Sequence, residues 1–156
     1  MSEAVLTNTK PILPATAGLT RALSPFAEPL LRVTAGLMLM PHGAQKLFGW
    51  FGGYGVDGTE QFFAQKLGLP ASLAVLTGLI EFFGGLALAL GFGTRIAAAL
   101  VVAMMAVAIV HVHLPAGYFW TAGGYEYPLM WGILALAFVV RGGGRYSLDA
   151  LVGREF

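Results

Sequence analysis

The chain has 156 residues, of which 57% are hydrophobic and only 11% are charged, and its formal net charge is +1. Soluble domains carry about 25% charged residues, so this composition indicates an integral membrane protein. The low net charge gives no electrostatic basis for binding nucleic acid. The sequence contains no cysteine, which excludes thiol–disulfide exchange, disulfide bonds and thiolate metal ligands.

The first twenty residues lack a long apolar segment and carry Glu3, unlike a cleavable signal peptide. We therefore interpret residues 1–28 as a cytoplasmic tail. Four apolar segments follow, at about 29–48, 71–92, 94–114 and 127–140. A bilayer core of about 30 Å needs about 20 helical residues, so the first three segments fit and the fourth is slightly short. Because none alternates like a strand, the sequence predicts one all-α domain over residues 1–156, a polytopic membrane four-helix bundle.

Basic residues predict the orientation of the bundle. They gather before the first segment, in the turn between the second and third, and in the tail: Lys10, Arg21, Arg32, Arg95, Arg141, Arg145 and Arg154. The positive-inside rule places both termini and that turn in the cytoplasm, and predicts a multi-pass protein. The two outer connections are rich in aromatic residues. Within the first of them, residues 57–67 are expected to form a short helix on the membrane surface.

Glu81 is the only charged residue between Ala71 and Leu90. A carboxylate at this depth costs about 2.5–3.5 kcal/mol on insertion scales, so such a residue is a functional-site hypothesis. The plainer interpretation is structural, with Glu81 bonding a neighbouring helix as a protonated acid or pairing with Lys46.

The predicted topology brings further titratable side chains to the outer half of the bundle, namely His42, Lys46, His111, His113 and Glu126. His42 and Lys46 are four residues apart and share a helix face. His111 and His113 point in directions about 200° apart, so only one of them can face the bundle. Each also has a plainer interpretation: Lys46 can snorkel to the headgroups, the histidines can be interfacial, and Glu126 can favour a helix amino terminus.

This set of side chains suits a quinone head group. An imidazole and a carboxyl group can exchange protons with its two oxygens while aromatic rings hold its ring. Further hydrogen bonds could come from the same layer, from Gln45, Thr77, Tyr125 and Tyr127. A metal held by His42, a histidine of the third segment and the glutamates is a weaker alternative, because the chain has no compact ligand motif. A haem has no attachment motif to support it.

Four motifs carry a resemblance to a known family. They are R-x3-G-x6-G-x2-K from Arg32 to Lys46, GLIEFFGGLALALGFGTR around Glu81, HLPAGYFW…GGYEYP from His113, and GGGRYSLD near the end. In this order they resemble the DoxX family of small four-helix bacterial membrane proteins, over roughly residues 30–151. His42, Lys46, Glu81, His113 and Glu126 fall on family-like motifs, and His111 is additional.

The resemblance implies a bundle in the bacterial cytoplasmic membrane. Family members are often labelled oxidoreductases, and related ones look like subunits of thiosulfate:quinone oxidoreductase or accessory parts of terminal oxidase and redox-stress complexes. The leading hypothesis is thus a membrane redox subunit that binds a quinone and receives electrons from a protein partner or a periplasmic reductant. It assigns catalytic roles to Glu81, His113 and His42, and binding roles to Lys46, Gln45, Glu126 and Tyr125, with no metal.

Two other functions remain open at this point. The chain could be a non-enzymatic assembly subunit in which the buried polar residues set the helix register. It could also be a small transporter, although four short helices without an inverted repeat or broken helix make this less favourable for a monomer. A homo-oligomer is compatible with each of these hypotheses.

Overall fold

The computed structural model describes residues 14–154, and every regular element in that range is helical, which confirms the predicted all-α class. The α-helices are α1 Pro14–Phe48, α2 Gly55–Phe62, α3 Ser72–Leu79, α4 Gly85–Leu90, α5 Thr94–Ala108, α6 Glu126–Arg141 and α7 Leu148–Val152. π-helical turns cover Phe63–Leu67, Ile80–Gly84 and Ile109–His113, and short 3-10 turns cover Trp50–Gly52, Leu114–Ala116 and Trp120–Ala122. The predicted surface helix is present as α2 and its π-helical turn, and it ends at Gly68 with φ +65°.

Two helical segments of the described chain, Ser72–Leu90 and Thr94–Ala116, are long and apolar enough to cross a membrane. They coincide with the second and third predicted spans and support a lipid environment for the protein. Helix α6 has 16 residues, in keeping with the short fourth segment. The count of four spans and the orientation of the termini stay predictions.

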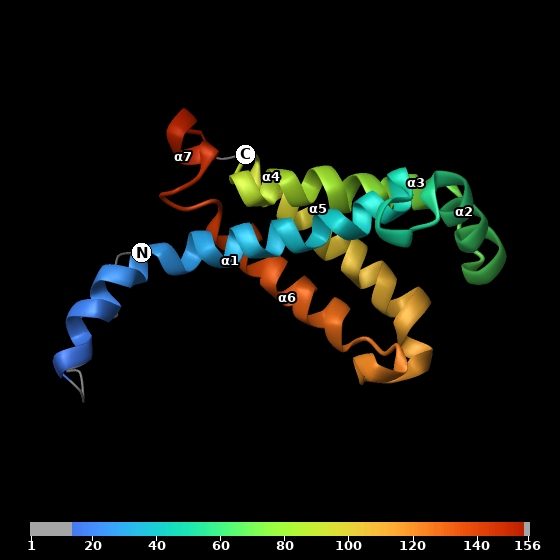
Figure 1. The fold of residues 1–156 in the computed structure, drawn as a ribbon, viewed down its shortest axis with the longest axis horizontal. Helices are drawn as coiled ribbons and strands as arrows, with labels where there is room; N and C mark the ends of the chain where they lie inside the picture. Colours follow the sequence, from blue (N-terminus) through green and yellow to red (C-terminus); the bar gives the residue numbers. More distant parts are fainter. Residues whose placement is uncertain (1–13, 155–156) are drawn as a thin grey trace.

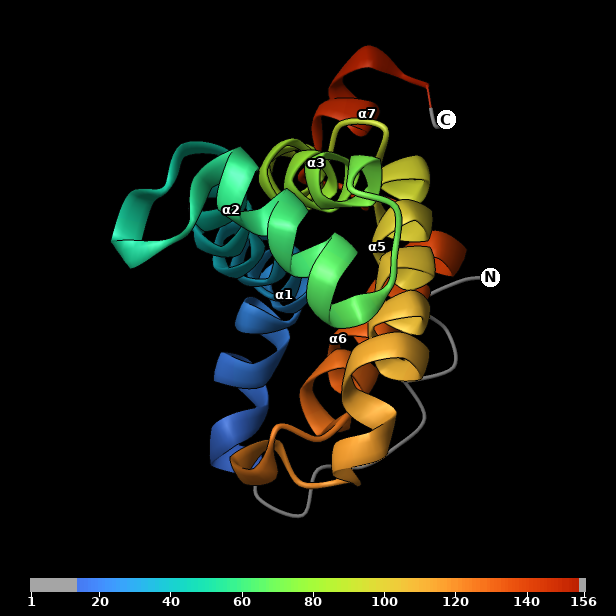
Figure 2. The same ribbon diagram turned by 90° about the vertical axis from the view of Figure 1, so that its right-hand side faces the viewer.

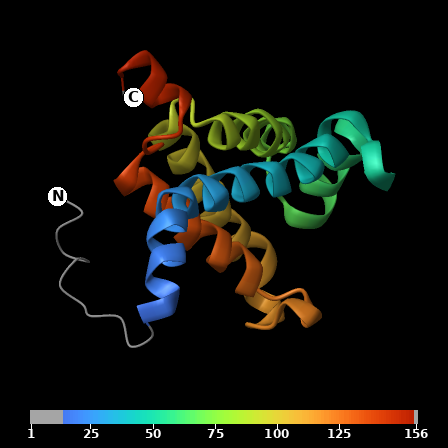
Figure 3. The same ribbon diagram turned by 60° about the vertical axis from the view of Figure 1, so that its left-hand side comes forward.

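Helix α1 begins at Pro14, far before the predicted span at residue 29. Part of the predicted tail is therefore helical, and residues 1–13 of that tail lie outside the described range. Proline at position 25 cannot donate to the carbonyl of Arg21, but Ser24 Oγ donates to that carbonyl at 3.2 Å. The helix turns in this region, so that its first turns lie across the direction of the rest (Figure 3).

The bundle consists of two helix pairs. Helix α1 packs against α3 and α4, whereas α5 packs against α6. The pairs diverge toward the end that holds α2 and residues 114–125, here called the α2 end (Figures 1 and 2). The opposite end holds α7 and the first turns of α1, and is called the α7 end.

Helix α1 approaches the α3–α4 segment closely at two glycines. A Cβ added at Gly36 would collide with the carbonyl oxygen of Gly85, and one at Gly43 with the backbone nitrogen of Phe82. Because glycine has no side chain, α1 can approach the α3–α4 segment closely at these positions, as expected for helices in membranes.

Two arginines close helix carboxyl ends at the α7 end. Arg32 is only 1% exposed, and its Nη1 donates to the carbonyls of Leu88 at 2.7 Å and Ala89 at 2.6 Å, in the last turn of α4. Its Nη2 donates to the carbonyl of Tyr146 at 2.6 Å. Arg95 likewise donates to two carbonyls at the end of α6. The last carbonyls of a helix have no partner within it, so each guanidinium satisfies acceptors and opposes the negative end of the helix dipole.

Asp149 of α7 caps the amino end of α5. Its carboxylate accepts hydrogen bonds from Gly93 N at 2.7 Å, Thr94 N at 2.9 Å and Thr94 Oγ1 at 2.7 Å. Burial alone would raise the pKa of Asp149, but the hydrogen bonds from Thr94 and Gly93 and the charge of Arg32 outweigh it, so the pKa lies below its ordinary value. The carboxyl-terminal segment is thereby fastened to the α4–α5 turn.

Replacing Arg32 by alanine is expected to destabilise the protein, because the carbonyls that it pairs would be left buried without donors. The expected loss is on the order of 1–3 kcal/mol for each unpaired buried group. Unfolding in mixed detergent micelles measures it. Arg154→Ala is the matched control, since Arg154 is exposed. Equal stabilities of the two variants would contradict the capping role of Arg32.

The depressed pKa of Asp149 predicts an acid-sensitive contribution to stability. The carboxylate form is favoured in the folded state, so the contribution is complete above the unfolded-state pKa, about 3.9, and is lost as the pH falls through the lower folded-state value. Asp149→Asn should lower the melting temperature at neutral pH. It should also reduce the further fall in melting temperature as the pH drops below about 4. Asp57→Asn, which changes an exposed carboxylate in α2, should do neither.

Candidate functional site

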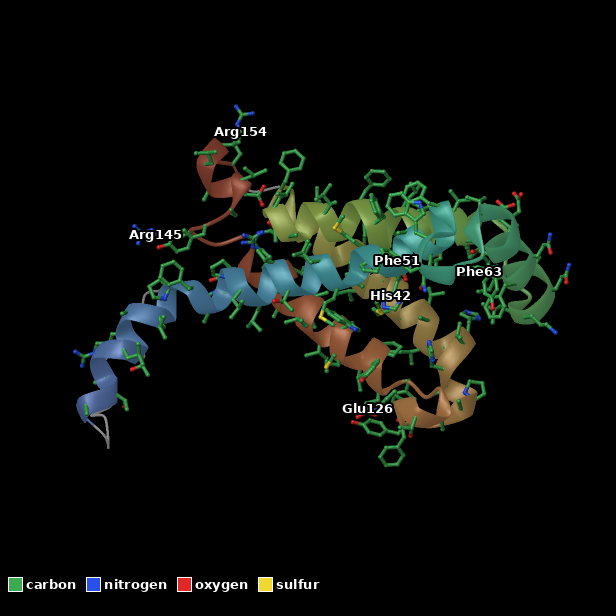
Figure 4. All side chains as sticks on the ribbon, in the orientation of Figure 1. His42, Phe51, Phe63, Glu126, Arg145 and Arg154 are labelled. Carbon is green, nitrogen blue, oxygen red and sulfur yellow. The ribbon has the colours of Figure 1, made fainter. Side chains whose placement is uncertain are left out.

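A cavity of about 420 Å³ lies where the two helix pairs diverge. Every helical layer contributes to its wall: Leu39, His42 and Lys46 from α1; Phe62, Phe63, Leu67 and Leu69 from the α2 region; Thr77 and Glu81 from α3 and its π-helical turn; Met104, Met105, Val107, Ala108, Val112 and His113 from the α5 region; and Trp120, Gly123, Gly124, Tyr127, Pro128 and Trp131 from the last loop and α6. Figure 4 shows His42 and Phe63 toward this end, whereas Arg145 and Arg154 lie at the α7 end.

Lys46 and Glu81 form an ion pair at the edge of this cavity. Lys46 Nζ donates to Glu81 Oε2 at 2.6 Å, and Glu81 is 9% exposed. Gly43 and Gly78 precede the two charged residues by three positions, and a Cβ at Gly43 would meet the carbonyl oxygen of Gly78 at 2.8 Å. The glycines therefore bring the two helices close enough for the charges to meet. Of the two pairings that the sequence left open for Glu81, the structure has the one with Lys46.

His42 lies one helical turn before Lys46 on α1. It lines the same cavity and is close enough to Glu81 to interact with it electrostatically. The cavity therefore holds an imidazole, an ammonium and a carboxylate in one layer. These groups provide hydrogen-bond donors and acceptors within a largely apolar wall.

His113 also lines the cavity, whereas His111 does not and is exposed. His113 Nδ1 lies 2.7 Å from the carbonyl oxygen of Gly123. A carbonyl only accepts hydrogen bonds, so we assign the proton to Nδ1, which leaves Nε2 of the neutral ring as an acceptor. Since the ring borders the cavity, Nε2 is the nitrogen that a ligand would meet. The expectation that only one of these histidines faces the bundle agrees with this placement.

Aromatic rings form much of the remaining wall. Trp120 and Tyr127 stack with their centroids 5.1 Å apart and an interplanar angle of 5°. Trp131 borders the cavity from the next turn of α6, and Phe62 and Phe63 border it from the α2 region. Ligand sites of about 300–1,000 Å³ typically combine such apolar and aromatic walls with a few polar groups.

All three π-helical turns of the described chain contribute residues to this wall. Phe63 and Leu67 come from the first, Glu81 from the second, and Val112 and His113 from the third. A π-helical turn holds an additional residue relative to an α-helical one and so redirects the side chains around it. Such turns occur frequently at functional sites, and their meeting at one cavity supports its candidacy.

Three residues predicted to bind the ligand lie outside the cavity wall. Gln45 Nε2 donates to the carbonyl of Phe51 at 3.3 Å. Glu126 Oε2 accepts from Trp120 N at 3.0 Å, at the amino end of α6 (Figure 4). Tyr125 packs edge-on against Tyr118, with centroids 5.5 Å apart. These residues shape the loops around the cavity, and their predicted direct contact with a ligand has no support in this geometry.

The sequence analysis missed several wall residues, chiefly Phe62, Phe63 and Trp131. The paired phenylalanines of the EQFF segment were the available signal, because they stand on a helix that was expected to lie on the membrane surface. Their contact with the interior depends on how α2 packs against α1 and α3. Across residues 14–154, no group of three or more His, Asp or Glu side chains is arranged to hold a metal ion.

Comparisons with known proteins agree with the resemblance found in the sequence. Residues 29–114 match the DoxX family. The chain is 31% identical over 123 residues to a Bacillus subtilis (strain 168) protein named "Putative oxidoreductase CatD", and the match covers 79% of this chain and 84% of the relative. No solved structure matches the chain significantly.

Energetic coupling between Lys46 and Glu81 is expected in a double-mutant cycle. Lys46→Met leaves the buried Glu81 carboxylate without its partner, so it should destabilise the protein more than the double variant Lys46→Met/Glu81→Gln. The expected coupling is about 1–3 kcal/mol, measured by unfolding in micelles. Lys66→Met, at an exposed position of the surface helix, should show no coupling to Glu81→Gln. Additive effects at Lys46 and Glu81 would contradict a stabilising pair.

Proposed function

Because this chain belongs to the DoxX family, we propose that it is a membrane subunit of a redox system and that it binds a quinone-like ligand in the cavity between the helix pairs. The family and a relative named as an oxidoreductase support the redox assignment. The observation that supports ligand binding is the cavity itself, where an ion pair and two histidines border a wall of aromatic and aliphatic side chains.

The wall fits the shape and chemistry of a quinone. A quinone head group is a flat ring with two oxygens at opposite edges, and it needs apolar or aromatic surfaces for the ring and polar groups for the oxygens. Trp120, Tyr127 and Trp131 offer the aromatic surfaces. Lys46, Glu81 and His113 offer the polar groups from three different elements. Met104 and Met105 line the cavity as flexible apolar side chains, which suit a tail of variable shape.

The polar residues take distinct roles in this proposal. A bound quinone undergoes two-electron chemistry in which its two oxygens gain or lose protons. Lys46 Nζ keeps donor capacity beyond its bond to Glu81 and would donate to one ligand oxygen. His113 Nε2, unprotonated in the assigned tautomer, would take up a proton from the outer side and pass it to one ligand oxygen as the ligand is reduced. Glu81 and His42 would supply the second proton beside Lys46.

The electrons would come from outside this subunit. The chain has no cysteine, so a thiol of its own supplies none, and a protein partner or a soluble reductant is proposed to deliver them. The α2 end would then face the periplasm of a bacterial cytoplasmic membrane, in agreement with the arginine-rich α7 end facing the cytoplasm.

One observation favours a second candidate, an assembly subunit without catalysis. The Lys46–Glu81 pair joins α1 to the α3–α4 segment, and a buried ion pair can specify how two helices meet. In that case substitutions at Glu81 and His113 would lower stability and partner co-purification together, and no small ligand would be involved.

Native mass spectrometry of the protein, gently extracted from its own membrane, distinguishes these two functions. A near-stoichiometric mass increment that matches a quinone supports the proposed site. A bare chain, or one that carries only other proteins, supports the assembly subunit and removes the enzymatic proposal.

Substitutions within the cavity should impair ligand binding more than folding. Glu81→Gln keeps the shape and a hydrogen-bonding group, and is expected to abolish quinone-linked electron transfer while the protein still inserts and folds. His113→Ala should weaken quinone binding at least tenfold, measured by quenching of the cavity tryptophans. His111→Ala is the matched control, since His111 lies on the same turn outside the cavity. Full activity of Glu81→Gln would remove its catalytic role.

A further inference from the structure

The first turns of α1, residues 14–28, carry two opposite faces. At about 100° per residue, the apolar side chains Leu19, Leu23 and Phe26 recur at intervals of four and three residues and share one arc of the helix. They are 64%, 55% and 53% exposed, respectively. A wide apolar arc of this kind is the pattern of a helix that covers an apolar surface.

The other arc is polar. Thr16, Thr20 and Ser24 follow one another at intervals of four residues and lie at about 60° to 140° from Leu19, whereas Arg21 and Glu28 lie at about 200° and 180°. Glu28 pairs with Arg141 at 2.7 Å. Thr20 Oγ1 donates to the carbonyl of Thr16 at 3.1 Å, and Ser24 Oγ to that of Arg21 at 3.2 Å. The polar face thus carries hydroxyl groups and charges, whereas the opposite face carries exposed aliphatic and aromatic groups.

The position of this segment follows from its continuity with the rest of α1. Leu23 precedes Pro29, where the predicted span begins, by six residues, or by about 9 Å of helix. Because the segment lies across the direction of the remaining helix (Figure 3), its apolar arc stays close to the level of the membrane surface. Phe26 stacks on Tyr146 of the carboxyl-terminal segment, with centroids 5.4 Å apart and an interplanar angle of 16°, which supports the turned direction.

We propose that the amino-terminal turns of α1 form a membrane-surface helix, with Leu19 and Leu23 inserted into the lipid leaflet at the α7 end. The occupant of the apolar arc is the boundary between headgroups and acyl chains, and the hydroxyl-bearing arc faces water. Arg21, about 200° from Leu19, lies on the arc that faces water. Lipid is favoured over a protein partner because the covalent link to the predicted first span places both leucines at the height of this boundary. The inference is independent of any ligand in the cavity.

The absence of cysteine makes a direct test simple, since each introduced thiol is the only one in the chain. Single variants Leu19→Cys and Leu23→Cys place a spin label on the apolar arc, and Ala17→Cys and Arg21→Cys place it on the polar arc. The full chain is reconstituted into vesicles of phosphatidylethanolamine and phosphatidylglycerol. Collision of the label with oxygen, which concentrates in lipid, is then compared with collision with a water-soluble nickel chelate.

The expected result is a several-fold higher ratio of oxygen to nickel accessibility at positions 19 and 23 than at positions 17 and 21. Equal, nickel-dominated accessibility at all four positions would overturn the proposal, because the helix would then lie in water. Immobile labels at 19 and 23 that are shielded from both reagents would also overturn it, in favour of a protein contact. A melting temperature equal to that of the parent chain confirms that each labelled variant is folded.

Discussion

The rest of this structure depends on two cations of α1, Arg32 and Lys46, each of which is paired by the α3–α4 segment. Arg32 bonds carbonyls at the end of α4, and Lys46 bonds Glu81. Arg32 and Lys46 are separated by fourteen residues of α1, about 21 Å along the helix. Between them, glycines bring the backbones of α1 and the α3–α4 segment together. Because unpaired charges are costly in an apolar environment, α1 can neither slide nor rotate against its partner without breaking one pair. Helix register is therefore set at two points.

The fixed packing of α1 against the α3–α4 segment explains how a small bundle leaves room for a cavity. Helices α5 and α6 pack mainly on each other, and Arg95 and Asp149 fasten them at the α7 end. At the α2 end, where the helices diverge (Figure 1), the Lys46–Glu81 bond lies within one pair and the His113–Gly123 bond within the other. The π-helical turns lie at this level and turn Glu81 and His113 toward the space. The helices are fastened together at the α7 end and diverge at the α2 end, and the cavity lies in the space between them.

Composition and charge predicted the helical class and the apolar segments, because these depend on the sum of many side chains. Glu81 and its pairing with Lys46 could be anticipated, since a lone carboxylate in an apolar segment needs a partner. The residues beside the loops were harder to place from the sequence. Gln45 near the end of α1 and Glu126 at the start of α6 bond to loop backbone, and Tyr125 packs against Tyr118. Such loops carry no periodic signal. The same holds for Phe63, whose place in the wall depends on how α2 packs against α1 and α3.

The ion pair has more than one explanation, and the surrounding packing helps to choose between them. If Lys46 and Glu81 served only to join two helices, an apolar pair of similar volume would do so equally well or better, because a buried ion pair repays little of its desolvation cost. Gly43 and Gly78 already bring the helices into contact. The charges also border the cavity rather than being sealed between backbones. The charges therefore stand where the proposed cavity chemistry would need them, and the same bond sets the helix register.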